Sequence, residues 1–371
     1  TGSSTWSQIG GDGVNSGFSG TTHTIVDSLA FADSTLYVGM TSGNAARSGE
    51  LWSFSGGAWT QLGGNYVNHS WGYRGLQSVE VMQVVGDYLY AGTGNTNTGN
   101  ALVWQFDGSI WTLVGGQGVN NSWASDTYEL VTSMASYLGE LYVGIGSTAN
   151  DAEVWHWDGS DWIQIGGDSL NSGWTTNYEE VNSMASYNGN LYAGLGNSAG
   201  DAEVWEWNGT IWSQIAGTAS GNWGTSGFDR VVSMGIYNNS IVAGLGSSGG
   251  EADVWSYSGS GTTWTKIGGD SVNSSWASPT YEQVESLIGY KGNLVAGLGT
   301  GADDAEVWLY DGTSWALIGG DEVNSSWSSG SYERTRTLVV YNGDVYAGLG
   351  TSDGDGEVWR YLDNTGTQVS G

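Results

Sequence analysis

The chain has no cysteine, a single proline and only eight lysine and arginine residues in 371 positions. Without cysteine it can form no disulfide bond, a condition that fits many compartments because export permits disulfides without requiring them. Its 38 acidic residues give a formal charge of −30, which repels the phosphates of nucleic acid. No apolar run approaches the roughly 20 residues of a membrane-spanning helix. These absences argue against nucleic acid as a partner and against membrane insertion.

Glycine, tryptophan and tyrosine are abundant instead, with 64, 22 and 20 copies. Glycine serves turns and large aromatic side chains suit pleated, half-buried surfaces, so the composition predicts an all-β protein. One motif recurs seven times along the chain, and its clearest copy spans residues 178–217. This copy contains four strand-like runs, at Val181–Tyr187, Leu191–Gly196, Glu203–Trp207 and Trp212–Ile215. Each copy is therefore expected to form one four-stranded antiparallel sheet.

The fourth strand of every copy opens with tryptophan. These strands begin near residues 6, 59, 111, 162, 212, 264 and 315. The first of them, Thr5–Gly11, has no strands before it, and the last three-strand run, Leu338–Tyr361, has no fourth strand after it. Pairing of these two segments closes a ring and removes the open edge of the array. The sequence predicts one domain, a seven-bladed β-propeller over residues 1–361, with residues 362–371 as a C-terminal tail or linker.

The blade motif resembles that of kelch and galactose-oxidase-type propellers. The resemblance rests on a glycine-containing second strand, LYAGLG at 191–196, an aromatic third strand, EVWEW at 203–207, and Trp212 shortly afterwards. Near-identical copies with tryptophan and polar residues in their loops are also similar to bacterial-type repeat propellers that act as multivalent lectins. The resemblance implies a propeller fold and a binding role.

The sequence offers little for catalysis. The copper site of a galactose oxidase needs tyrosine, histidine and a cysteine-linked tyrosine, but cysteine is absent and His23, His69 and His156 fall in different blades. Acidic residues recur in similar loops of successive blades, whereas catalysis needs one special pocket in which pKa values are driven apart. We therefore expect no enzymatic activity.

The long loops are expected on one rim of the ring, because the short first-to-second and third-to-fourth turns share the other rim. An N-S-x-W element recurs on this loop-bearing rim, followed by an aromatic residue and an acid. The tryptophans of the element are Trp71, Trp123, Trp174, Trp276 and Trp327, and a variant places Trp223 similarly. The acids are Glu129, Glu179, Asp229, Glu282 and Glu333. Aromatic faces stack on pyranose rings while carboxylates bind hydroxyl groups, so these residues predict carbohydrate sites.

Other interpretations of these residues stay open. The repeated tryptophans could fill the wedge where adjacent blades diverge, as we expect for third-strand tryptophans such as Trp155 and Trp157, and the acids could cap backbone N–H groups. Acidic loop ends suit calcium, with Asp353 and Asp355 as the best single candidate. The other pairs are Asp151 with Glu153, Asp201 with Glu203, and Asp304 with Glu306. No D-x-D-x-D-G motif occurs, so we expect no cofactor, with calcium as the alternative.

The sequence as a whole predicts a non-catalytic, multivalent carbohydrate-binding or adhesive module, extracellular or at the cell surface, with a glycan or polysaccharide as its partner. Loop differences indicate that the first, second and fifth sites are degraded. The alternative is a structural subunit or domain of an extracellular filament, sheath or appendage fibre, in which the same loops contact neighbouring protein subunits. The chain begins with Thr1 instead of methionine, which indicates processing or excision from a longer chain.

Overall fold

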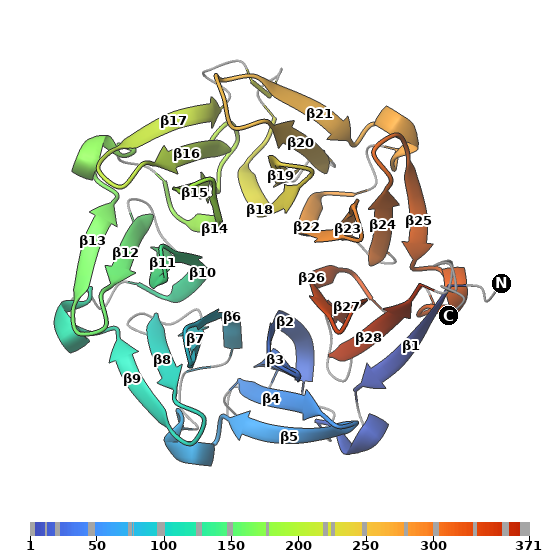
Figure 1. Ribbon diagram of the computed structural model, residues 1–371, viewed down its shortest axis with the longest axis horizontal. Coiled ribbons are helices and arrows are strands. Elements are labelled where there is room, and N and C mark those ends of the chain that lie inside the picture. The colour runs from blue at the N-terminus through green and yellow to red at the C-terminus, as the bar shows by residue number, and fades with distance from the viewer. Residues whose placement is uncertain are drawn as a thin grey trace, which may run out of the picture.

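The chain forms seven blades of four antiparallel strands around a central axis, and the pairing of Gly246 with Gln283 joins two of these blades (Figure 1). The computed structural model describes residues 4–11, 13–18, 23–43, 49–72, 76, 78–94, 101–123, 128–146, 151–175, 178–217, 222–223, 227–246, 251–277, 281–299, 304–328, 332–350 and 356–363. The predicted all-β, seven-bladed propeller is confirmed.

In blades 1 to 6 the four strands follow one another in the chain from the central axis outward (Figure 1). Blades 1 to 3 are β2 (His23–Ala32), β3 (Thr35–Ser42), β4 (Glu50–Ser55), β5 (Ala58–Gly63); β6 (Ser78–Val85), β7 (Tyr88–Gly94), β8 (Leu102–Phe106), β9 (Trp111–Gly115); and β10 (Leu130–Tyr137), β11 (Glu140–Gly146), β12 (Glu153–Trp157), β13 (Trp162–Gly166). Blades 4 and 5 are β14 (Val181–Tyr187), β15 (Asn190–Leu195), β16 (Glu203–Trp207), β17 (Trp212–Gly217); and β18 (Arg230–Tyr237), β19 (Ser240–Gly246), β20 (Asp253–Tyr257), β21 (Trp264–Gly268). Blade 6 is β22 (Gln283–Tyr290), β23 (Asn293–Gly299), β24 (Glu306–Tyr310) and β25 (Trp315–Gly319).

Blade 7 combines both ends of the chain. Its three inner strands are β26 (Thr335–Tyr341), β27 (Asp344–Leu349) and β28 (Glu357–Leu362), and its outer strand is β1 (Thr5–Gly10). The register of β1 and β28 runs from Thr5 opposite Leu362 to Gly10 opposite Val358. The predicted closure of the ring by the N-terminal strand is confirmed, and β28 includes Leu362, the first residue of the predicted tail.

Hairpin turns at one rim follow the turn chemistry of the sequence. Asn188 and Gly189, between β14 and β15, have φ values of 50° and 81°, the left-handed pair of a type I′ turn. The equivalent turn of blade 7 uses Asn342 and Gly343 with φ values of 50° and 82°. The opposite rim carries the second-to-third loops and the blade-to-blade connections, so it is the loop-bearing rim.

The hydrophobic core lies between neighbouring blades. One cluster joins Tyr142 and Val154 of blade 3 to Leu191 and Trp212 of blade 4, all of them buried. Equivalent clusters occupy the other blade junctions, so each blade is stabilised by both of its neighbours. Among the described residues, no helix has the length and apolar character needed to cross a membrane.

Candidate functional site

The N-S-x-W element forms a compact loop that follows the fourth strand. In the copy between blades 6 and 7 it contains the 3-10 turn η6 (Val323–Ser325), in which Asn324 has a φ of 53°. Asparagine tolerates this left-handed conformation better than most residues. The Asn324 Nδ2 donates to the Ile318 carbonyl at 2.9 Å, and the Ser326 Oγ accepts from the Gly320 N–H at 2.9 Å. The five other described turns of this kind are η1 (Val14–Ser16), η2 (Val67–His69), η3 (Val119–Asn121), η4 (Leu170–Ser172) and η5 (Val272–Ser274).

The loop turns its tryptophan into the protein. Trp327 is 3% exposed, and its Nε1 donates to the Ala305 carbonyl at 2.7 Å. Its ring meets Trp6 edge to face at 5.2 Å and Trp359 at 5.7 Å. The other five tryptophans of the element are equally buried and donate to an equivalent carbonyl: Trp71, Trp123, Trp174, Trp223 and Trp276. These six rings therefore pack between blades, and the predicted stacking of a sugar on them finds no exposed ring face.

The predicted acids lie elsewhere. Glu129, Glu179, Asp229, Glu282 and Glu333 are all partly exposed and directly precede the innermost strand of their blade or lie within two residues of it. At blade 4, Glu179 accepts a hydrogen bond from the Asn197 side chain. At blade 7, Glu333 is absent from the lining of the groove that contains Trp327. The structure thus does not bring the predicted tryptophans and acids into one site there.

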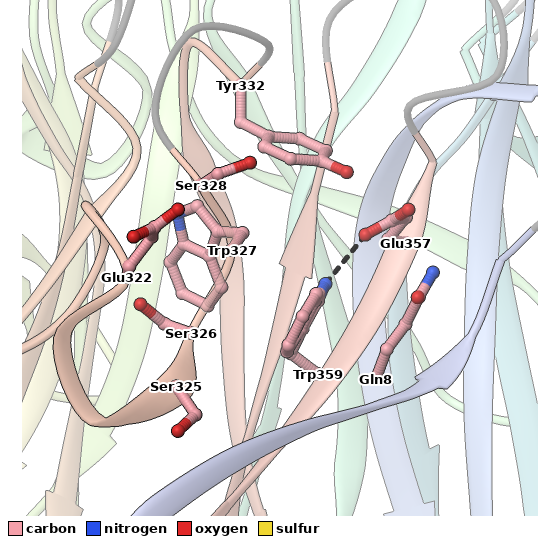
Figure 2. Close-up of a pocket in the computed structure, with 9 residues that line it drawn as sticks. All are labelled: Gln8, Glu322, Ser325, Ser326, Trp327, Ser328, Tyr332, Glu357 and Trp359. Carbon is pink, nitrogen blue, oxygen red and sulfur yellow. Dashed lines mark hydrogen bonds between the residues drawn. The ribbon is translucent and has the colours of Figure 1, made fainter.

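A groove of about 590 Å³ opens on the loop-bearing rim, between the outer strands of blade 7 and the preceding loop (Figure 2). Four side chains that can contact a ligand line one wall, and we call them the groove residues: Gln8 from β1, Glu357 and Trp359 from β28, and Tyr332 from the connection. The Trp359 Nε1 donates to Glu357 Oε2 at 2.7 Å, and the Trp359 ring is partly exposed. Trp327 and the serines of its loop, Ser325, Ser326 and Ser328, form the other wall with Glu322.

The same four residue types recur at two other blades. Their Nε1 to carboxylate hydrogen bonds are 2.8 Å long in both. The sets are Gln164, Tyr128, Glu153 and Trp155 in blade 3, and Gln214, Tyr178, Glu203 and Trp205 in blade 4. In both, burial raises the pKa of the glutamate, and hydrogen bonds from the tryptophan and the tyrosine partly offset this rise.

Two of the other blades have a different residue at the position of the glutamate. In blade 5, Asp253 forms an ion pair with Lys266 at 2.7 Å, and burial raises the pKa of Asp253 to about 6 despite this partner. In blade 2, Leu102 stands where the glutamate would be, and the buried Trp104 Nε1 has no hydrogen-bond partner among the described residues.

Two further blades keep the glutamate and change its surroundings. Blade 6 pairs Glu306 with Trp308 at 2.7 Å, but Leu317 replaces the glutamine. In blade 1, Glu50 binds the ring of His23 at 3.1 Å and the indole of Trp52 at 2.9 Å. The complete set of groove residues is therefore found in blades 3, 4 and 7.

The predicted packing of third-strand tryptophans is confirmed for Trp157, which is 6% exposed and lies in a core cluster. Trp155 differs from this prediction, because it is partly exposed beside Glu153. The E-V-W pattern of the sequence indicates this arrangement, because it places the acid and the first tryptophan on the same face of a strand.

As for calcium, the described residues contain no cluster of three acidic or histidine side chains able to hold a metal ion, and Asp353 and Asp355 lie outside the described residues.

Neither a protein-family model nor a curated protein sequence matches this chain. Several solved structures are similar to it over nearly its full length. A structure described as YCF48 bound to D1 peptide has a TM-score of 0.55 at 14% identity, covering 99% of this chain and 98% of that one. Sqt1 of Saccharomyces cerevisiae has a TM-score of 0.55 at 12% identity, covering 98% and 100%, and U3-55K has 0.54 at 13% identity, covering 91% and 95%. The shared feature is the β-propeller fold. At these identities the likeness shows the fold alone and does not single out kelch or lectin propellers.

Proposed function

We propose that the chain is a non-catalytic binding module that holds a carbohydrate in the grooves of its loop-bearing rim. The groove of blade 7 carries the proposal, because Trp359 offers a partly exposed ring beside a carboxylate and an amide (Figure 2). A pyranose ring stacks its C–H face on an indole while Glu357 and Gln8 bind its hydroxyl groups. The stacking residue in this proposal is the third-strand tryptophan, in place of the buried loop tryptophan.

The repetition of the groove residues makes the proposed module multivalent. Blades 3, 4 and 7 carry complete sets, so three weak sites on one rigid ring would engage a polysaccharide together. Such a ligand is found at cell surfaces and outside cells, which is where we propose that the protein acts.

Protein contact is the second candidate, as in a subunit of an extracellular filament, sheath or appendage fibre. It is supported by large hydrophobic side chains on the short-turn rim, where Phe31 is 51%, Tyr88 is 42% and Leu138 is 75% exposed. Sedimentation of the purified protein separates the candidates, because a filament subunit self-associates with rising concentration whereas the glycan-binding module stays at constant mass.

A glycan array, followed by calorimetric titration of the best sugar, tests the proposal. Replacing the three groove tryptophans with alanine, Trp155, Trp205 and Trp359 together, should abolish binding while the circular dichroism spectrum stays that of a propeller. The matched control is Trp104→Ala, because that third-strand tryptophan lies in the blade that lacks the glutamate. It should leave binding unchanged.

Two results would count against the proposal. A blank array from folded wild-type protein would remove the carbohydrate ligand, and full binding by the triple variant would remove the grooves as its site. Repeating the titration with a chelator tests calcium, since loss of binding in its presence would add a cation to the site.

A further inference from the structure

The innermost strand of each blade has a β-bulge at the same place. The register slips by one residue on each first strand, as between Val26 and Ser28 on β2 and between Thr335 and Thr337 on β26. A bulge leaves one residue unpaired and re-aims its side chain. The seven bulge residues are Asp27, Glu80, Thr132, Asn182, Val232, Glu285 and Arg336.

The bulge residues differ between blades, whereas the residue before each of them is nearly constant. The residue before the bulge is valine in six blades and threonine in the seventh: Val26, Val79, Val131, Val181, Val231, Val284 and Thr335. The bulge position itself ranges from Asp27 through Val232 to Arg336. Copies that agree in the packed positions therefore differ at the position that the bulge re-aims, which makes the ring asymmetric near its axis.

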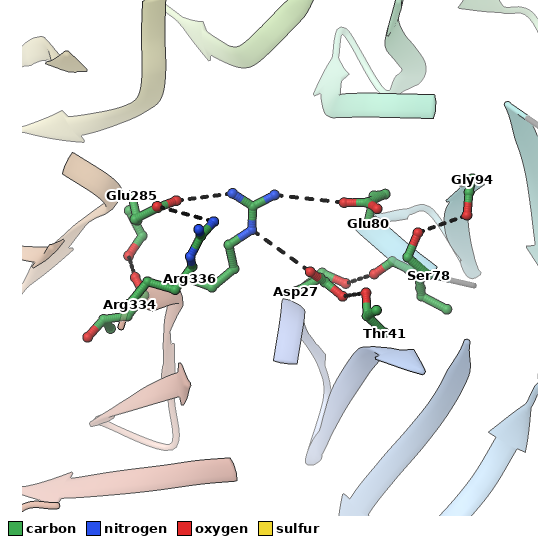
Figure 3. Close-up of polar contacts among 12 residues, drawn as sticks. Asp27, Thr41, Ser78, Glu80, Gly94, Glu285, Arg334 and Arg336 are labelled. Carbon is green, nitrogen blue, oxygen red and sulfur yellow. Dashed lines mark hydrogen bonds and ion pairs between the residues drawn. The ribbon is translucent and has the colours of Figure 1, made fainter. Parts of the chain in front are cut away.

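Arg336 lies at the centre of a charged network that spans blades 1, 2, 6 and 7 (Figure 3). Its Nη1 is 3.0 Å from Glu285 Oε2, its Nη2 is 3.8 Å from Glu80 Oε2, and its Nε is 3.9 Å from Asp27 Oδ1. The Glu285 side chain has no exposed surface and also lies 3.7 Å from Arg334 Nη1. One buried carboxylate thus fixes the position of two guanidinium groups.

Both guanidinium groups face a cavity of 350 Å³ at the axis. The side chains of Arg334 and Arg336 are 28% and 32% exposed, while those of Asp27 and Glu285 behind them are 4% and 0% exposed. Arg230 also lines the cavity, where its charge lowers the pKa of the neighbouring Glu180 against the effect of burial. The other polar groups of the lining are Glu80, Thr132, Glu180, Asn182 and Gln283.

Basic residues are concentrated in this lining. Three of the eight basic residues of the chain meet here, beside Glu80 and Glu180. Around it the chain carries a formal charge of −30. Guanidinium forks bind carboxylates with two parallel hydrogen bonds, and buried acids behind them keep the forks in place.

We propose that this cavity is a binding site for a small organic anion with carboxylate groups, distinct from the rim grooves. Arg230, Arg334 and Arg336 anchor the carboxylates, and Asn182 and Gln283 supply further hydrogen bonds. The site is single, because only this asymmetric arrangement of bulge residues and their neighbours brings the three arginines together.

Calorimetric titration with citrate tests the site, with glucose as a neutral comparison. Wild-type protein should bind citrate at one site per chain and fail to bind glucose there. Arg230→Gln should weaken citrate binding by about tenfold or more, the loss expected for one charged hydrogen-bonding group. We choose Arg230 because Arg336→Gln would remove an ion pair from each of the buried acids Asp27 and Glu285.

The matched control is Arg360→Gln on β28, whose guanidinium pairs with Asp344 at 2.6 Å. It changes the net charge as Arg230→Gln does, so citrate affinity should stay at the wild-type value. Absence of citrate binding by folded wild-type protein would overturn the proposal. Equal weakening by the two variants would overturn it as well, because binding would then follow overall charge. Binding of inorganic phosphate in preference to citrate would overturn the assignment of a carboxylate ligand.

Discussion

Trp6 joins the N-terminal strand to the rest of the ring, and its replacement tests the closure directly. The side chain is 3% exposed, and its Nε1 donates to the Ile318 carbonyl of blade 6 at 2.7 Å. Its ring meets Trp327 at 5.2 Å and Tyr361 of β28 at 5.1 Å. Trp6→Ala removes these contacts and one of the two hydrogen bonds that the Ile318 carbonyl accepts, the other coming from Asn324. We therefore expect a loss of about 3–5 kcal/mol in the free energy of unfolding, most of it from the large cavity.

The matched control is Trp212→Ala in the middle of the chain. Trp212 is 2% exposed, donates to the Ile165 carbonyl at 2.8 Å and meets Trp174 at 5.2 Å, so its surroundings are the same as those of Trp6. Urea denaturation, followed by circular dichroism, should give losses that agree to within about 1 kcal/mol. A Trp6→Ala loss below about 1 kcal/mol beside a full loss for Trp212→Ala would refute closure, because β1 would then be detached in solution.

Two further predictions concern groups near the axis and on the rim. Burial, followed by repulsion from Glu80, raises the pKa of Asp27 from 3.8 to about 8, so the folded state holds this proton more tightly than the unfolded state does. The free energy of unfolding should therefore fall as pH rises from about 4 to about 8, and Asp27→Asn should reduce that fall. If urea denaturation at pH 5 and pH 8 gave the same fall for both proteins, the prediction would be contradicted. Asn324→Ala should lower the free energy of unfolding by about 1–3 kcal/mol, measured by thermal or urea denaturation. The substitution removes the hydrogen bond to the Ile318 carbonyl and puts alanine at a φ of 53°, which alanine disfavours. A loss no greater than that of the exposed Asn208→Ala would show that the loop does not depend on this residue.

The fold could be predicted because the repeat specifies it several times over. Tryptophan at the start of each fourth strand, the Asn-Gly turns and the split last blade all point to the same ring. The closure between Thr5 and Leu362 followed from counting strands at both ends.

The site was only partly predictable, because tryptophan serves both packing and binding. Trp327 and Trp359 both stand in polar stretches near the same rim, yet one is buried and the other partly exposed. What separates them is the left-handed turn at Asn324, which folds the loop so that Trp327 enters the wedge between blades. No pattern of polar and apolar residues encodes that backbone turn.

The charged network at the axis could be predicted only in part. Alternation along a strand places Arg334 and Arg336 on one face, and both do face the cavity. The bulges that re-aim Asp27, Glu80 and Glu285 have no signal in the sequence. The partners of Arg336, moreover, come from blades 1, 2 and 6, which are distant in the chain and close only after the ring has closed.

Blade 2 shows that a residue can recur in this protein for a structural reason. Where Leu102 replaces the glutamate, the buried Trp104 Nε1 is left without a partner, a deficit that costs about 1–3 kcal/mol. The glutamates beside Trp155, Trp205, Trp308 and Trp359 remove that cost, so their recurrence has a structural cause of its own. Evidence for a ligand must therefore come from groups that the fold does not require. The glutamine of the groove is such a group, since blade 6 folds with leucine in its place. Arg230 of the axis is another, since Leu130 and Gln283 occupy equivalent positions without any charge.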